Sequence, residues 1–516
     1  VMPEYNAWKI FYERNKQAAY LTDVTRGTTP IYQEIPNLSA AKSAYGNIVY
    51  RKAPSFLRQA EFYLGEDKFQ TAVRQFLKKH EFANAEWTDL VKEFELASKQ
   101  DLKNWANVWV KQSGLPIMRV KPLKWTNSTR VDFFLQQTNV SNDTDLWKMK
   151  VNTFVKFKDF PPMVLTNEFN GKSLNEFIGK NQIMLGSYTN IDVVDFIFPN
   201  YQDYGYGIFL LDEKSRAYVL QNIQTEKDDF LRSMMWGSLW DSVRFYELAP
   251  EDYVKLVIKN INVETDESTI QTLLGRVSTA MNYYLSAAQA EKIAPEIEKL
   301  LIDKMQNAPT LGQRITFYRS FVALARSENA RNVLKEILSG KLKIKELDLK
   351  AKDKFDIVTK LITLGDEDGL KLLAELEKTY TDDAAKRYAY AAKAGIPTAE
   401  NKAKYWNDFV NNKDISESYI ESAFAVFNTP RQDDLTLPYL EKALAELPNL
   451  KQNRKIFFVN GWLGAFIGGQ KSEQALQIVN KFLADNPNLD KDLRLKILEN
   501  SDALERAVKI RAKYEK

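Results

Sequence analysis

The feature that most limits how this chain can fold is a helical hydrophobic period that recurs from about residue 201 to the last residue, 516. Apolar side chains spaced three and four residues apart line one face of a helix. Such sets include Leu231, Met234, Met235 and Leu239, then Tyr253, Leu256 and Val257, and later Ala475, Leu476, Val479 and Leu483. Short breaks such as Ala308-Pro309-Thr310 separate the sets, and they follow no strict sequence period. The pattern therefore predicts an α-solenoid of irregular helix pairs, similar to HEAT or armadillo arrays, over residues 201–516.

A second period, of two residues, appears in the middle of the chain. Apolar residues from Met149 to Phe157 alternate largely with polar ones, which is typical of a half-buried strand. Shorter β-rich runs occur at residues 130–136, 163–169 and 193–198. We interpret residues 117–200 as a small antiparallel β-sandwich that carries no catalytic motif.

The first 116 residues follow the helical period again. One stripe, made of Leu102, Trp105, Val108 and Trp109, is the spacing of a core-facing helix that ends at Gly114 and Pro116. A chain of 516 residues is too long for a single core. The predicted fold is thus mostly α with a small β-sandwich, in three domains at residues 1–116, 117–200 and 201–516.

Composition excludes several classes of function. The net charge of +4, from 72 basic and 68 acidic residues, gives no electrostatic reason to expect a nucleic-acid partner. No run of 18 apolar residues occurs, so we expect no membrane span in this chain. There is no cysteine, which excludes disulfides and thiol chemistry. The single histidine, His80, argues against a Ser-His-Asp triad and excludes any site built on two imidazoles; we interpret it as a solvated residue at a helix end.

The candidate catalytic stretch is SAYGNIVYRKAPSFL at residues 43–57. It places Tyr45 and Tyr50 in a small-residue loop that runs into a helix expected to begin near Pro54, since proline is tolerated in a first turn. Just before a helix N-terminus, a phenol could donate a hydrogen bond to a developing oxyanion. The spacing alone nevertheless favours a packed core tyrosine with a satisfied hydroxyl.

Several further segments of the sequence, together with the stretch around Tyr50, resemble a known protein family. The segments that carry the resemblance are Tyr50-Arg51-Lys52-Ala53-Pro54, Phe62-Tyr63-Leu64-Gly65-Glu66, Phe82-Ala83-Asn84-Ala85, Trp87-Thr88-Asp89-Leu90 and Gly114-Leu115-Pro116, with weaker agreement at Trp236 to Asp241 and Glu264 to Glu267. Together they resemble the zinc aminopeptidases of the M1 family, or gluzincins. In that family the tyrosine of a Tyr-x-Lys-Gly segment stabilises the tetrahedral intermediate, and Tyr50 is the matching residue. Ala53 replaces the glycine of that segment, which keeps a small residue there.

The resemblance also implies what should lie elsewhere. The family binds zinc through His-Glu-x-x-His and a later glutamate, and it holds the substrate amino group with Gly-x-Met-Glu-Asn; this sequence contains neither motif. We therefore expect the chain to be the C-terminal portion of such a metalloprotease, in which residues 1–116 complete a thermolysin-like catalytic domain. The expected partners are peptide substrates and the upstream N-terminal and zinc-binding domains of the same protein. This chain alone would bind no zinc and be inactive. A bacterial, extracytoplasmic (periplasmic) location is implied by the resemblance only.

Other residues and other functions remain open. Tyr45, Lys52 and Arg58 could line the substrate cleft, although packing or solvation explains each of them equally well. The chain could instead be a non-catalytic interaction module, because an α-solenoid offers a broad concave surface for a peptide or protein. A naturally split aminopeptidase is a third possibility.

Overall fold

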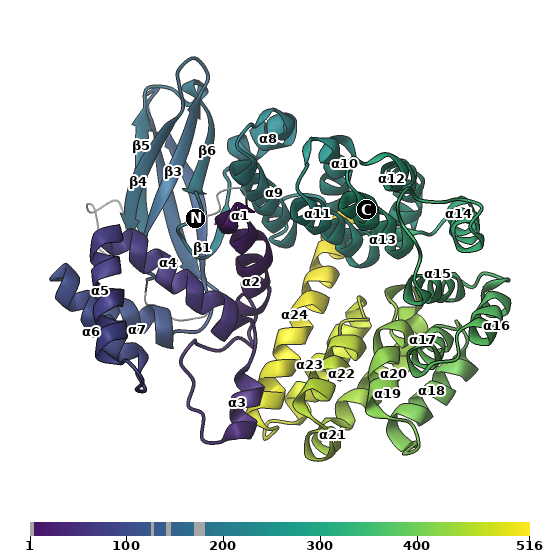
Figure 1. Ribbon diagram of the computed structural model, residues 1–516. Helices are drawn as coiled ribbons and strands as arrows, with labels where there is room; N and C mark the ends of the chain where they lie inside the picture. Colours follow the sequence, from purple (N-terminus) through teal and green to yellow (C-terminus); the bar gives the residue numbers. More distant parts are fainter. Residues whose placement is uncertain (1–4, 125–127, 141–145, 170–180, 516) are drawn as a thin grey trace. The chain divides into compact units, whose positions relative to one another are not determined.

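The computed structural model describes residues 5–124, 128–140, 146–169 and 181–515 (Figure 1). The chain divides into two compact units, Val1–Phe245 and Tyr246–Lys516. It is mainly helical with one small region of β-structure, which confirms the predicted fold class. Within the described ranges, no helix combines the length and the apolar character needed to cross a membrane.

The first unit begins with helices. A rod made of α1 (Ala7–Ile10), the π-helical segment η2 (Phe11–Lys16) and α2 (Gln17–Asp23) keeps helical backbone angles across both junctions. The helices that follow are α3 (Leu38–Ala44), the π-helical segment η3 (Ile48–Lys52), α4 (Ala53–Leu64), α5 (Glu66–Lys79), α6 (Trp87–Ser98) and α7 (Lys103–Lys111). Gly65, with a φ of +91°, separates α4 from α5, because this backbone conformation favours glycine. His80 follows α5 directly, at the helix end predicted for it. It is half-buried, with its ring 5.2 Å from that of Phe76, so the prediction of a solvated side chain was wrong.

Two sheets form the β-sandwich of this unit. Its strands are β1 (Pro116–Lys124), β2 (Val131–Asn139), β3 (Met149–Phe157), β4 (Met163–Phe169), β5 (Gln182–Tyr188), β6 (Val194–Tyr201) and β7 (Ile208–Leu210). One sheet has the order β5-β2-β1-β7 and the other β4-β3-β6. All described pairings are antiparallel except that of β7 with β1. Trp105 and Trp109 of α7 are buried in the core shared with these strands, so the predicted tryptophan stripe is a core feature.

The helices after the sandwich still belong to the first unit. They are α8 (Glu213–Asn222), the short η5 (Ile223–Thr225) and α9 (Asp229–Arg244). Helix α8 packs on β6 and α9 packs on β7, where the Ser238 hydroxyl donates to the Phe209 carbonyl oxygen at 2.8 Å. The predicted domain boundary at residue 200 therefore lies inside a compact unit, whose chain runs on to Phe245.

The second unit is a series of packed helices. They are α10 (Pro250–Asn260), α11 (Glu267–Thr279), α12 (Ala287–Asn307), α13 (Leu311–Leu324), α14 (Glu328–Ser339), α15 (Ala351–Thr363), α16 (Gly369–Thr379), α17 (Asp383–Ala394), α18 (Ala399–Asn411), α19 (Glu417–Phe427), α20 (Asp433–Ala445), α21 (Leu447–Asn453), α22 (Ile456–Phe466), α23 (Glu473–Asp485) and α24 (Lys491–Tyr514), with short turns η6 (Ile261–Val263), η7 (Ala280–Tyr284) and η8 (Pro430–Gln432). Neighbours such as α12 and α13, or α23 and α24, pack against each other, as expected for a solenoid. The last helix also returns to the start of the unit, because the Tyr514 hydroxyl donates to the Tyr246 carbonyl oxygen at 2.9 Å.

Candidate active site

Tyr50 lies in the first turns of a helix rather than in a loop. The segment η3 continues into α4 with helical backbone angles, and the Tyr50 amide donates to the Gly46 carbonyl oxygen at 3.2 Å. The prediction that the helix begins near Pro54 was therefore wrong by about two turns. The backbone accepts the proline because the turn before it is π-helical: the Ala53 amide donates five residues back, to the Ile48 carbonyl oxygen. Single π-helical turns of this kind are rare, and those that occur often lie at functional sites.

The Tyr50 side chain points to the surface. It is 63% exposed, and the ring of Tyr45, which is 53% exposed, meets it edge to face with ring centroids 5.8 Å apart. The alternative of a packed core tyrosine is thus excluded. The phenol of Tyr50 is available to a ligand, and Tyr45 is placed beside it.

Lys52, two residues further on, is buried. Its ammonium pairs with the Asp23 carboxylate at 2.8 Å and donates to the Gly114 carbonyl oxygen at 2.8 Å. Burial lowers the pKa of Lys52, and the charge of Asp23 opposes that shift. Lys52 therefore does not line an open cleft of the described chain, because its side chain is fixed inside the first unit.

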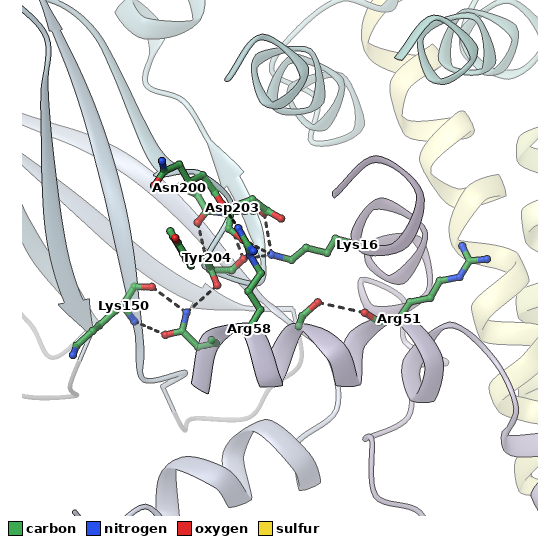
Figure 2. A network of polar contacts seen from close by, with 11 residues as sticks. Lys16, Arg51, Arg58, Lys150, Asn200, Asp203 and Tyr204 are labelled. Atoms are coloured by element: carbon green, nitrogen blue, oxygen red, sulfur yellow. Dashed lines mark hydrogen bonds and ion pairs between the residues drawn. The ribbon is translucent and has the colours of Figure 1, made fainter. Parts of the chain in front are cut away.

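Arg58 is also an interior residue. Figure 2 shows Arg58 and Lys16 converging on Asp203: the Arg58 guanidinium donates to the Gln202 carbonyl oxygen at 2.7 Å and to that of Asp203 at 3.2 Å. The Lys16 ammonium pairs with the Asp203 carboxylate at 2.9 Å. The ring of Trp8 stacks on the guanidinium, 3.6 Å from its centroid. Arg58 thus holds the turn before β7 instead of facing a cleft.

Burial shifts the pKa values of this second cluster in the directions expected of groups removed from water. It lowers the pKa of Lys16 to about 8, against the opposing charge of Asp203, and it raises the pKa of Asp203. The pair is held by further contacts, since Lys16 also donates to the Gly205 carbonyl oxygen and Asn200 donates to the carboxylate.

Sequence reasoning missed Asp23 and Lys16, although the sequence carries a signal for both. On the helical rod from α1 to α2, the buried residues Tyr12, Lys16, Ala19, Tyr20 and Asp23 follow the spacing of a single helix face. Charged residues in phase with an apolar stripe are rarely buried unless they are paired. Lys16 and Asp23 lie on this apolar face, so each is predicted to have a buried partner. In the structure Lys16 pairs with Asp203, and Asp23 pairs with Lys52.

The residues present do not fit a zinc site. Across the described ranges, no group of three or more His, Cys, Asp or Glu side chains is arranged to hold a metal ion. The whole sequence contains one histidine and no cysteine, so the side chains with the strongest preference for zinc are almost absent.

Comparison with known proteins assigns the chain to a family. Residues 1–109 match the peptidase family M1 domain, and residues 196–506 match the ERAP1-like C-terminal domain. The chain belongs to the M1 aminopeptidase family. Aminopeptidase N of Streptomyces lividans is 25% identical over 519 residues, covering 98% of this chain and 59% of the relative.

Other relatives align over shorter parts of the chain. Tricorn protease-interacting factor F2 of Thermoplasma volcanium is 21% identical over 397 residues, which is 75% of this chain and 46% of the relative. Aminopeptidase M1-D of Oryza sativa is 28% identical over 207 residues, covering 39% of this chain and 23% of the relative. The chain thus spans less than two thirds of the length of the relatives that it matches.

Proposed function

We propose that this M1 family chain contributes Tyr50 as an oxyanion-binding group to an aminopeptidase that removes N-terminal residues from peptides. The observation that carries the proposal is the position of Tyr50, whose exposed phenol stands on a π-helical turn in the part of the chain that matches the peptidase domain. The hydroxyl donates a hydrogen bond to the substrate carbonyl oxygen as negative charge develops there. This interaction is stronger in the transition state than in the bound substrate, which is what accelerates the reaction.

The proposal divides the chemistry between this chain and other parts of a larger enzyme. The zinc on which the family generally depends is proposed to be held by residues outside this chain, since the residues present do not fit it. The chain alone is accordingly proposed to be inactive, and peptides are the proposed substrates of the complete enzyme.

The test is Tyr50→Phe in the complete enzyme, assayed with an aminoacyl anilide. We expect kcat to fall about a hundred- to a thousandfold, as for the loss of one oxyanion donor, with little change in KM or metal content. Tyr419→Phe is the matched control, because it removes a tyrosine hydroxyl of the second unit that donates to Asp383 at 2.8 Å. An unchanged kcat for Tyr50→Phe would remove this tyrosine from the mechanism.

A second candidate function rests on the second unit. A cavity of about 320 Å³ lies between α11 and α13, lined by Gln271, Leu274, Ser278, Thr316 and Arg319 among others. This mixture of apolar and polar groups supports the proposal that the helical unit binds a peptide segment without catalysis. Gly275 also lines this cavity, and a Cβ there would meet open space. Binding of a peptide to the isolated chain, lost on Gly275→Trp, would favour the interaction module over the enzyme.

A further inference from the structure

The turn that presents Tyr50 also sends a charge into the interior. Tyr50 is 63% exposed, whereas Lys52 is completely buried. Residues two apart on a helical turn do not face each other, so the two side chains leave the turn on different sides. Any movement of the Lys52 anchor is passed through a single short segment of backbone to the phenol.

That anchor is held from several segments at once. The Asp23 carboxylate, at the end of α2, accepts hydrogen bonds from the Thr28 hydroxyl at 2.6 Å, the Gly114 amide at 3.1 Å and the Tyr206 hydroxyl at 3.0 Å, in addition to the Lys52 ammonium at 2.8 Å. These donors come from the loop after α2, the turn before β1 and the turn before β7. The position of Lys52 is therefore fixed relative to both the helices and the sandwich of the first unit.

Two further contacts join the same turn to the same helical rod. The Asn47 side-chain amide donates to the Thr22 hydroxyl at 2.9 Å, and the Arg51 guanidinium donates to the Arg14 carbonyl oxygen at 3.0 Å. Both lie nearer to solvent than the Lys52–Asp23 pair, whose two side chains are fully buried. The buried pair is the contact with the most restricted geometry, because its polar atoms have no water to turn to.

We infer that Lys52 and Asp23 are positioning residues, which hold the turn Ile48–Lys52 so that the Tyr50 hydroxyl meets the developing oxyanion. The inference rests on the proposed function of Tyr50. A misplacement of about 1 Å in a reacting group costs on the order of a hundredfold in rate. Removing the pair is therefore expected to lower kcat about ten- to a hundredfold, with KM changed less than about threefold.

The experiment is a double-mutant cycle in the complete enzyme. Lys52→Met and Asp23→Asn are combined, so that no unpaired charge is left buried, and this neutral pair is introduced with and without Tyr50→Phe. If the pair acts through the Tyr50 hydroxyl, the neutral pair lowers kcat at least tenfold when Tyr50 is present. It lowers kcat less than about twofold in the Tyr50→Phe background.

A second buried ion pair in the same unit is the matched control. Lys16→Met combined with Asp203→Asn removes a pair of similar burial and distance, and Lys16 is not on the Tyr50 turn. Its effect on kcat is expected to be the same in both backgrounds. Tyr206→Phe is the milder variant if the neutral pair does not fold, because it deletes one hydrogen bond to Asp23 and no charge. Tyr206→Phe is expected to lower kcat about three- to tenfold when Tyr50 is present, and this loss should again not add to that of Tyr50→Phe.

The outcomes separate the inference from the proposal on which it rests. Equal losses of kcat in both backgrounds would mean that Lys52 and Asp23 are structural residues, and the inference would be overturned while Tyr50 kept its role. An unchanged kcat for Tyr50→Phe alone would overturn both together.

Discussion

Lys402 is a buried ammonium that closes two helices of the second unit. Its side chain is completely buried on α18. It donates to the Phe427 carbonyl oxygen at 2.6 Å and to the Ala394 carbonyl oxygen at 3.1 Å, and these residues end α19 and α17. The ring of Phe427 also faces the ammonium, at 4.7 Å from the centroid. Carbonyl groups at helix C-termini carry partial negative charge, so a donor from Lys402 satisfies both ends.

The perturbation that we predict in depth is Lys402→Met. Burial lowers the pKa of Lys402 from its ordinary value of 10.5 to about 7 in the folded protein. Between these two values the unfolded chain holds a proton that the folded chain does not, so the stability of the wild type rises with pH. This gain in the free energy of unfolding is complete above the unfolded pKa of 10.5, and it is lost as the pH falls through the folded pKa of about 7. With about 1.4 kcal/mol for each pKa unit, the free energy of unfolding should gain about 2 kcal/mol from this group between pH 7 and pH 9.

The assay is urea unfolding of the wild type and Lys402→Met at pH 7 and pH 9, followed by far-ultraviolet circular dichroism. Methionine does not titrate, so the wild type should gain about 2 kcal/mol on the variant over this range. Lys404→Met, which replaces an exposed lysine on the same helix, should show a difference that changes by less than about 0.5 kcal/mol. A wild-type advantage over Lys402→Met that stays constant from pH 7 to pH 9 would refute the reasoning, because the ammonium would then keep its proton in the folded state.

Two glycines should respond to alanine in opposite directions. Gly207 has a φ of +149°, and a Cβ there would lie 2.6 Å from the Pro116 carbonyl oxygen. Gly207→Ala should therefore lower the free energy of unfolding by about 2–3 kcal/mol. A loss smaller than about 1 kcal/mol in urea unfolding would contradict this prediction. Gly275 lies within α11, and the space that an alanine methyl group would occupy there is open. Gly275→Ala should therefore raise the free energy of unfolding by about 0.5–1 kcal/mol, and a measured loss would contradict the expected gain in helix propensity.

The hydrophobic period predicted most of the helices and the strands β2, β3, β4 and β6, but it did not predict β1, β5 and β7. Strand β1 reads PIMRVKPLK, and its second half is exposed, so local alternation there is weak and Pro116 was interpreted as the end of a helix. Strand β7 has three residues and exists because it pairs with β1. Such short pairings are set by tertiary contacts, which a local pattern does not contain.

The candidate site could be predicted only in part, because a local sequence pattern does not contain tertiary contacts. The chemistry of Tyr50 follows from its residue type and from the resemblance of its neighbours to a family motif. The helical state of residues 48–52 did not follow, because Gly46 and Asn47 are typical loop residues and the π-helical turn is supported by contacts with α2. The orientation of Lys52 and Arg58 did not follow either, since a charged residue is normally expected in solvent.

The buried charges of the first unit are better explained by geometry than by stability. Replacing a buried ion pair with apolar residues of similar size is often neutral or stabilising, so the Lys52–Asp23 pair contributes little that packing could not supply. Apolar side chains do not fix an orientation, because dispersion contacts allow the packed groups to shift relative to each other. The Asp23 carboxylate does fix one, because its hydrogen bonds from four donors are directional. A turn that must hold the Tyr50 phenol at a set position requires such a fixed orientation. The neutral pair should therefore cost the complete enzyme far more in kcat than in thermal stability, which is the combination that a purely structural ion pair would not give.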